Sequence, residues 1–339
     1  MSASALQLSL LREVSRSFYL TLRVLPGRIR TPIGLAYLLA RTTDTIADTE
    51  LVAVDLRLQA LEALRRRIAG LDQRIAGSDQ TSLNFGGLAR QQGIPAERVL
   101  LENCEESLAL LQAQPSEDQR LIRQVLDIIA SGQELDLRRF AGASADNVLA
   151  LGTEQDLDDY TYRVAGCVGE FWTRICRAQL FPKAPLDDAF LLTQGVRFGK
   201  GLQLVNILRD LPTDLRHGRC YLPADKLAGL ALKPHDLLDP SAEARLRPLY
   251  NPWLERAEAH LLAGWAYTNT LPRRCVRVRL ACAWPILIGL STLRLLRVEN
   301  VLDPCRHIKV SRRDVKRLML RSLLLYPYPA AWRRLATPS

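Results

Sequence analysis

The sequence lacks a long uncharged apolar run. The longest, Leu280–Leu293, has 14 residues and is interrupted by Pro285, which makes it too short to cross a bilayer as a helix. A secretory signal is also missing, because Met1–Ser4 carries no basic residue and Arg12 and Glu13 follow too early. We therefore expect neither a transmembrane anchor nor a signal peptide.

Cysteine pairs with metal-binding spacing are absent as well. The seven cysteines are an odd number and include no C-x-x-C pair, which argues against a disulfide framework and against a zinc ribbon. Hydrophobic residues make up 48% of the chain and charged residues 24%, proportions typical of globular proteins rather than disordered ones. These features favour a cytoplasmic globular protein.

Acidic residues are outnumbered by basic ones. The chain has 46 Lys and Arg against 36 Asp and Glu, a net charge of +10, and only six of these cations are lysine. Because arginine binds phosphate through two parallel hydrogen bonds, the excess points to an anionic partner or, alternatively, to solvated helix faces. No basic run with interleaved aromatics and no helix-turn-helix signature occurs, so we expect no nucleic-acid binding. A non-enzymatic basic helical module remains the remote alternative.

Apolar residues recur at intervals of three and four nearly everywhere, and no segment alternates convincingly as a strand does. This period predicts an all-α protein of about ten or more helices in one domain, residues 1–339. Segments with Gly, Pro, Ser or Asp predict the breaks between helices. These breaks are Ala69–Gln80, Gln114–Gln119, Ala141–Asn147, Phe181–Asp187, His217–Asp225 and Leu237–Ser241.

Two predicted helices carry acidic residues within apolar surroundings. Ile33–Ala47 is apolar or small almost all round, yet Arg41, Asp44 and the following Asp48 fall within roughly 60° of one another on a helix. Val196–Asp214 has a similar stripe within roughly 80°. That stripe consists of Gln203, Asn206, Asp210 and Asp214, and Pro212 is expected to kink the helix or loosen its end.

Aspartates on apolar helices must be paired, protonated or bound to a cation. One D-x-x-x-D pattern alone is usually an exposed face or a local salt bridge, but two copies on apolar helices favour a shared site. If the two helices faced each other, they would form an oxygen-rich cavity suited to Mg²⁺, a cation that bridges carboxylates to a diphosphate.

Five segments, quoted in chain order, resemble the motifs of the squalene and phytoene synthases. They are Ser15–Phe18 (SRSF), Asp44–Asp48 (DTIAD), Tyr160–Gly169 (YTYRVAGCVG), Gly201–Asp210 (GLQLVNILRD) continuing through Asp214 to Gly218–Pro223 (GRCYLP), and Lys309–Arg312 (KVSR). The motifs extend from about residue 10 to 312, and a basic and apolar tail follows over 313–339. The resemblance covers most of the chain.

This resemblance implies a head-to-head prenyltransferase with the isoprenoid synthase fold, a single domain whose helices surround a central apolar cavity. In such an enzyme one allylic diphosphate loses pyrophosphate, and the resulting cation is attacked by the double bond of a second molecule to give a cyclopropyl diphosphate. The apolar cavity keeps water from the cation. Gly166 and Gly169 are expected to allow helices to approach closely.

The resemblance also implies roles for individual residues. It makes Asp44, Asp48, Asp210 and Asp214 the catalytic aspartates that hold Mg²⁺, and it implicates Tyr160 in the first half-reaction. The substrate-binding residues that it implies, together with the polar stripe residues, are Arg16, Ser17, Arg41, Gln203, Asn206, Arg209, Arg219, Lys309 and Arg312. For Tyr160, Arg16, Ser17, Gln203 and Asn206, a packing or helix-contact role is the alternative.

The first aspartate motif resembles that of eukaryotic-type squalene synthases, although Ala47 stands where that type has Glu. The spacing within Lys309–Arg312 instead resembles bacterial and carotenoid members. We favour squalene synthesis from farnesyl diphosphate with reduction by NADPH, although no Rossmann glycine fingerprint occurs. The alternative is phytoene synthase, which would take geranylgeranyl diphosphate, or dehydrosqualene synthase; neither needs a reductant. Oligomeric state is left open.

The tail has the composition of a membrane-surface segment. A basic cluster begins with Arg312 of the last motif and continues into the tail with Arg313, Lys316, Arg317 and Arg321. The apolar Leu323–Tyr328 and Ala330–Trp332 follow, and then Arg333 and Arg334. Basic clusters next to apolar aromatic segments bind anionic lipid. We expect peripheral membrane contact through this tail, and the alternative is that it packs on the domain.

Overall fold

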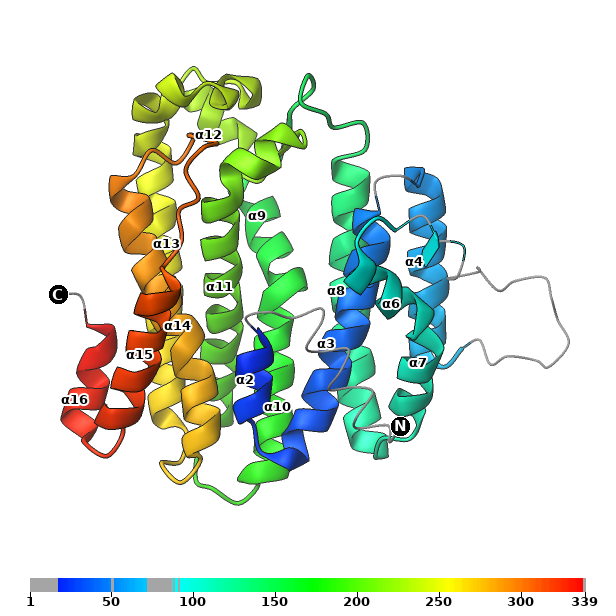
Figure 1. Ribbon diagram of the computed structural model, residues 1–339, viewed down its shortest axis with the longest axis vertical. Coiled ribbons are helices and arrows are strands. Elements are labelled where there is room, and N and C mark those ends of the chain that lie inside the picture. Colours follow the sequence, from blue (N-terminus) through cyan, green and yellow to red (C-terminus); the bar gives the residue numbers. More distant parts are fainter. Residues whose placement is uncertain (1–17, 50–51, 72–86, 88, 91, 338–339) are drawn as a thin grey trace, which may run out of the picture. The chain divides into compact units, whose positions relative to one another are not determined.

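The computed structural model describes residues 18–49, 52–71, 87, 89–90 and 92–337. These residues are helical almost throughout (Figure 1), which confirms the all-α prediction. Chain contacts divide the molecule into two compact units: unit 1 is residues 1–138 and 174–182, and unit 2 is residues 139–173 and 183–339. Arg16 and Ser17 lie outside the described residues.

Unit 1 is built around helix α3, Gly27–Asp48, which contacts four other helices of the unit along its length. Leu35, Leu38, Leu39 and Ile46 of α3 are at most 1% exposed, as expected of a helix that is apolar nearly all round. The other helices of unit 1 are α2 (Phe18–Val24), α4 (Val54–Ala69), α6 (Pro95–Glu102), α7 (Cys104–Gln112), most of α8 (Ser116–Arg139) and the last part of α10 (Cys167–Leu180).

Unit 2 is built around the long helix α11, Asp188–Arg216. It lies beside α13 (Glu243–Thr270) and α14 (Val276–Val298), as Figure 1 shows. The other elements are β1 (Leu149–Ala150), α9 (Glu154–Thr161), the π-helix η1 (Tyr162–Gly166), the first part of α10, β2 (Arg219–Cys220), α12 (Ala224–Gly229), the 3₁₀-helices η2 (Pro234–Leu238) and η3 (Pro240–Ala242), α15 (Arg312–Leu325), α16 (Pro329–Arg333) and η4 (Arg334–Ala336).

The predicted breaks at Ala141–Asn147 and Phe181–Asp187 lie between helices, whereas α8 begins inside the predicted break Gln114–Gln119 and 3₁₀-helices occupy most of Leu237–Ser241. Pro212 does not end α11, which continues to Arg216. Asp210 and Asp214 therefore lie on one continuous helix, one turn apart. Asp187 is the N-cap of this helix: its side chain accepts a hydrogen bond from the Phe190 backbone N–H at 3.0 Å. This bond satisfies one of the N–H groups that a helix start leaves without a partner.

Helix α14 is longer than the uncharged run that the sequence contains. Its 23 residues make it the single described helix long and apolar enough to cross a membrane by length and composition. However, 67% of its most apolar window is buried inside the protein, where it packs against α11 and α13. A helix that is apolar all round is also what the centre of a helical core requires, and α14 occupies such a position.

The first two helical turns after Tyr160 pack against α11 with almost no side chain between the backbones. A Cβ atom added at Gly169 would lie 1.9 Å from the carbonyl oxygen of Gly195, and one added at Gly199 would lie 2.1 Å from that of Ala165. The expectation of close backbone approach is therefore confirmed at Gly169, whereas a Cβ at Gly166 would meet only side-chain atoms, at 3.1–3.3 Å. Only glycine permits this spacing at the two tightest positions.

Gly169→Ala is accordingly expected to lower the free energy of unfolding by about 1–3 kcal/mol, because the two helices must separate to admit the methyl group. Gly229, which ends α12, is the matched control: a Cβ there meets nothing within 4 Å, so Gly229→Ala should change stability by less than about 1 kcal/mol, in the stabilising direction. Urea denaturation followed by circular dichroism measures both. Equal stability of the two variants would contradict the close packing.

Candidate active site

The first aspartate motif lies at the C-terminal end of α3 in unit 1. Arg41 makes ion pairs with Asp44, three residues later, and with Glu97 of α6. Burial, and after it the negative charge of Asp48, raise the pKa of Asp44 to about 7 even though Arg41 opposes both effects. Two carboxylates on one face thus resist simultaneous ionisation, and such a pair has the donor chemistry to accept a hard divalent cation.

Glu97 was not predicted from the sequence. Its side chain is almost buried, at 9% exposure for the residue, and it lies in the first turn of α6, where an acidic residue stabilises the helix N-terminus. Its contact with Arg41 holds the guanidinium between α3 and α6. The sequence signal for Glu97 was only that of a helix start, Ile94–Glu97, with no indication of its partner.

The second aspartate motif lies in the last part of α11 in unit 2. Asp210 and Asp214 are half-buried, as is Gln203, whereas Asn206 is exposed. Arg209 donates two hydrogen bonds to the Asp210 carboxylate, at 2.8 and 2.5 Å. These two parallel hydrogen bonds form a fork between guanidinium and carboxylate, and they raise the pKa of Arg209. The same fork geometry binds phosphate oxygens, so the arginine is suited to exchange one anion for another.

A short parallel strand pair connects the end of α11 to α9. β1 pairs with β2 so that Leu149 lies opposite Arg219, and the Leu149 backbone N–H donates to the Gly218 carbonyl at 2.8 Å. Gly218 has φ of +78°, and a side chain there would collide with the Ser144 backbone, so this turn requires glycine. The pair places Tyr221, two residues beyond Arg219, beside α9.

Tyr160 and Tyr221 form a buried aromatic pair. Their rings stack at 4.9 Å between centroids and 23° between planes, their hydroxyl oxygens are 3.4 Å apart, and the residues are 9% and 7% exposed. Phe140 meets the Tyr221 ring edge-on at 5.3 Å. Tyr221 belongs to the quoted GRCYLP segment but was not predicted as a site residue, because its partner lies 61 positions away in sequence.

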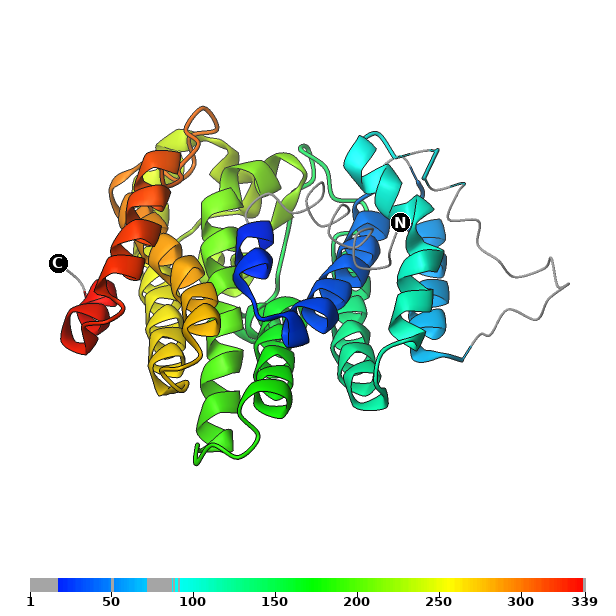
Figure 2. The ribbon, with the colours of Figure 1, turned by 60° about the horizontal axis from the view of Figure 1, so that its bottom comes forward.

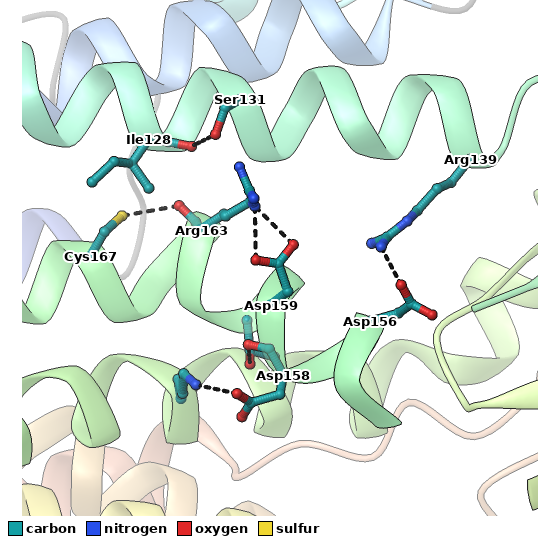
Figure 3. Close-up of polar contacts among 10 residues, drawn as sticks. Ile128, Ser131, Arg139, Asp156, Asp158, Asp159, Arg163 and Cys167 are labelled. Atoms are coloured by element: carbon teal, nitrogen blue, oxygen red, sulfur yellow. Dashed lines mark hydrogen bonds and ion pairs between the residues drawn. The ribbon is translucent and has the colours of Figure 1, made fainter. Parts of the chain in front are cut away.

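The acidic residues of α9 are held by cations, as Figure 3 shows for three of them. Asp158 accepts a hydrogen bond from Lys200 of α11 at 2.8 Å, Asp159 pairs with Arg163 at 2.8 Å, and Asp156 pairs with Arg139 at 2.5 Å. Asp158 also pairs with Arg256 of α13 at 3.5 Å. The two pairs of Asp158 tie α9 to α11 and α13, and the pair of Asp156 ties it to the end of α8, so these contacts hold the helix that carries Tyr160.

The chain then leaves the α-helical pattern for one turn of π-helix, Tyr162–Gly166. Such a turn inserts an extra residue into a helix and is frequent at functional sites. Here it lies directly after Tyr160 and against α11. No sequence signal other than the small residues Ala165 and Gly166 indicated this irregular turn.

The remaining predicted site residues are on the surface or on β2. Arg219 is half-buried, whereas Lys309 and Arg312 are exposed before and at the start of α15. Among the residues that the structure describes, no group of three or more His, Cys, Asp or Glu side chains is gathered as a metal site. Each aspartate motif instead offers two carboxylates from one helix.

Comparison with protein families gives a match to the squalene/phytoene synthase model over residues 11–314. Among curated proteins, presqualene diphosphate synthase of Rhodopseudomonas palustris is 29% identical over 308 residues, covering 90% of this chain and 92% of its own. Squalene synthase of Saccharomyces cerevisiae is 26% identical over 85% of this chain and 60% of its own. The bifunctional lycopene cyclase/phytoene synthase of Blakeslea trispora is 28% identical, and the match spans 46% of its length.

Two solved structures share the fold over nearly the whole chain. TcSQS in complex with the ligand E5700 has a TM-score of 0.74 at 22% identity, covering 98% of this chain and 95% of that one. A dehydrosqualene synthase in complex with a ligand has a TM-score of 0.65 at 20% identity, covering 96% and 97%. At these identities the likeness establishes the fold and not the substrate.

Proposed function

The chain belongs to the squalene/phytoene synthase family of head-to-head prenyltransferases, and we propose that it joins two farnesyl diphosphates through presqualene diphosphate and reduces that intermediate to squalene with NADPH. The observation that carries the proposal is the buried Tyr160–Tyr221 pair, held beside the end of the second aspartate helix by the β1–β2 pairing. It combines cation-stabilising aromatic rings with a diphosphate-binding helix in one unit.

Asp44 and Asp48 on α3, and Asp210 and Asp214 on α11, are the residues that would hold Mg²⁺. The raised pKa of Asp44 supports this assignment. Burial and the neighbouring carboxylate disfavour its ionised form, and a bound cation would stabilise that form. When bound, Mg²⁺ neutralises the negative charge on a departing diphosphate.

The arginines beside the aspartates would bind the diphosphate directly. Arg41 and Arg209 are each paired with an aspartate of the motif. When those carboxylates turn to a cation, the guanidinium groups can donate to phosphate oxygens through the same parallel hydrogen bonds. Arg16, Ser17, Gln203, Asn206, Arg219, Lys309 and Arg312 stay as proposed substrate-binding residues.

The aromatic pair serves the carbon chemistry. Loss of pyrophosphate from the first substrate leaves an allylic cation at C1, the C2–C3 double bond of the second attacks it, and a proton leaves that C1 carbon as the cyclopropane ring closes. The ring of Tyr160 can stabilise positive charge through its face, and its hydroxyl can accept or relay the proton, with pyrophosphate as the rival base. Burial excludes water from the cation.

The second half of the proposed reaction is the reduction of presqualene diphosphate to squalene. An enzyme that stops at presqualene diphosphate is the second candidate, because the relative named presqualene diphosphate synthase aligns over nearly all of both chains. The two candidates differ only in the NADPH-dependent step. Phytoene synthesis would need geranylgeranyl diphosphate instead, and dehydrosqualene synthesis would need no reductant.

Incubation of the purified chain with farnesyl or geranylgeranyl diphosphate, each with Mg²⁺ and with or without NADPH, tests these assignments. We expect farnesyl diphosphate to be used and squalene to form only with NADPH. Presqualene diphosphate as the sole product with NADPH present would favour the second candidate. A C40 hydrocarbon from geranylgeranyl diphosphate, or dehydrosqualene, would overturn the proposal.

A further inference from the structure

The C-terminal segment is fastened to unit 2 by one side of helix α15 and by α16. Trp332 is 2% exposed, stacks on Trp265 at 5.2 Å between ring centroids, and donates its indole N–H to Asn269 at 2.8 Å. Ser322, fully buried, accepts a hydrogen bond from Trp284 of α14 at 3.0 Å. The segment therefore has a fixed orientation on unit 2, and Trp332, expected from the sequence in an apolar membrane-facing stretch, is instead part of the core.

The opposite side of α15 is apolar and exposed. Leu320, Leu323 and Leu324 are 57%, 47% and 63% exposed, and Tyr328, just beyond the helix, is 64% exposed. On a helix these three leucines fall on one face, opposite Ser322. Three leucines that share one exposed face are a patch and not scattered surface residues. Figures 1 and 2 show α15 beside α14 at one edge of unit 2, with α16 next to α15.

The same face is strongly basic toward its N-terminal end. Arg313, Lys316 and Arg317 are exposed there, and on the helix they lie within the same arc as the leucines. Asp314 is the single acidic residue in 312–337. Its carboxylate accepts a hydrogen bond from the Ser311 hydroxyl at 2.7 Å and pairs with Arg317 at 3.7 Å.

More cations lie at the turn after α15. Tyr326 donates its hydroxyl to the Arg273 carbonyl at 2.6 Å, and the Arg273 guanidinium donates to the Pro327 carbonyl at 3.2 Å. This contact brings the start of α14 beside the turn. Further exposed basic residues follow Arg273 along the chain or lie just beyond the turn: Arg274, Arg277, Arg333 and Arg334.

We propose that this face of α15, with Leu320, Leu323, Leu324 and Tyr328 flanked by the basic residues, binds the surface of an anionic lipid bilayer. The leucines would enter the boundary between headgroups and acyl chains, and the cations would contact the headgroup phosphates. Charge complementarity selects this occupant: a second copy of this face would bring like charges together, and a nucleic acid would leave the leucines without a partner.

The proposal stands on the surface alone and does not depend on which hydrocarbon or diphosphate the enzyme makes. It assigns the full-length folded chain a peripheral position on the membrane, with α15 lying along the surface. A hydrophobic product could then pass into the bilayer without crossing water.

Flotation of the full-length chain with unilamellar vesicles is the test. Vesicles of phosphatidylcholine alone are compared with an equal mixture of phosphatidylcholine and phosphatidylglycerol, at low and at high salt. We expect the chain to float with the anionic vesicles at low salt, with binding that weakens as salt screens the charges. Absence of flotation with both compositions would overturn the proposal.

Two variants with matched controls locate the surface. The double variant Lys316→Glu/Arg317→Glu should weaken vesicle partitioning at least about tenfold, and Leu324→Gln about threefold to tenfold. The control for the charge reversal is Lys183→Glu/Lys233→Glu, at two exposed lysines away from α15. The control for the apolar change is Leu56→Gln, at a leucine that is 51% exposed. Controls that lose as much partitioning as the variants would show general charge attraction and contradict the proposal.

Two further measurements separate lipid binding from misfolding and from self-association. Thermal unfolding should be unchanged by these surface substitutions, so a lost signal cannot be ascribed to misfolding. Light scattering coupled to gel filtration reports the oligomeric state. A dimer that Leu324→Gln dissociates would show that a second copy covers this face, which would overturn the lipid assignment.

Discussion

Replacement of Asp210 by asparagine is expected to lower kcat by about 10²–10³-fold, and Asp44→Asn by a similar factor. Each change keeps the side-chain shape but removes one charge from the carboxylate pair proposed to hold Mg²⁺. The fold should survive, because Arg41 retains Glu97 as a partner and Arg209 is only half-buried. Steady-state kinetics with farnesyl diphosphate across a Mg²⁺ titration measures the effect.

Asp55→Asn in α4 and Asp146→Asn in the loop before β1 serve as controls, since both residues are exposed and lie outside the two motifs. They should retain turnover within about twofold of the wild type, because surface changes of this kind shift energies by less than about 0.5 kcal/mol. Circular dichroism of all four variants checks the helical fold. Wild-type turnover in Asp210→Asn, with normal Mg²⁺ dependence, would remove that residue from the site.

Tyr160→Phe should slow formation of presqualene diphosphate by about 10²-fold. The affinity for farnesyl diphosphate should change much less, because the hydroxyl is assigned to carbon chemistry and not to the diphosphate. The stacked ring remains, so any stabilisation of the cation by the aromatic face is kept. Single-turnover kinetics under saturating substrate separates the chemical step from binding.

Two other tyrosines show whether the effect belongs to Tyr160 itself. Tyr221→Phe removes the neighbouring hydroxyl 3.4 Å away and should produce a smaller loss, since it acts only by orienting Tyr160. Tyr250→Phe removes a buried hydroxyl that donates to the Leu208 carbonyl at 2.9 Å, which should cost stability alone. Identical single-turnover rates for Tyr160→Phe and the wild type would leave Tyr160 as a packing residue.

The sequence predicted the parts of the site that local pattern controls. The period of apolar residues gave the helices, and carboxylates spaced by four on apolar helices marked α3 and α11. Gly169 signalled close packing because glycine within a helix costs stability unless contact requires it. The order of the motifs supplied the family, which the match over residues 11–314 bears out.

Pairings between distant segments were beyond that reasoning. Glu97 has no feature that distinguishes it from any acidic residue at a helix start, and its contact with Arg41 spans 56 positions. Tyr221 required the turn at Gly218 and the β1–β2 pairing before it could be placed on Tyr160. Strands of two residues are too short to produce an alternating pattern.

The tail shows the same limit. Its basic and apolar composition was evident, but composition could not tell which aromatic residue faces inward. Trp332 packs on Trp265 because residues of α13 supply both its stacking surface and its hydrogen-bond acceptor. The leucines of α15 that remain exposed are identified only once that docking is known.

The ratio of pyrophosphate released to farnesyl diphosphate consumed, measured without NADPH and with or without a chelator of Mg²⁺, tests the central claim most directly. Head-to-head condensation through the two aspartate motifs predicts one pyrophosphate for every two substrates, with presqualene diphosphate accumulating and with no release under chelation. Release of one pyrophosphate for each substrate with farnesol as the product, or release that persists when Mg²⁺ is removed, would contradict the account.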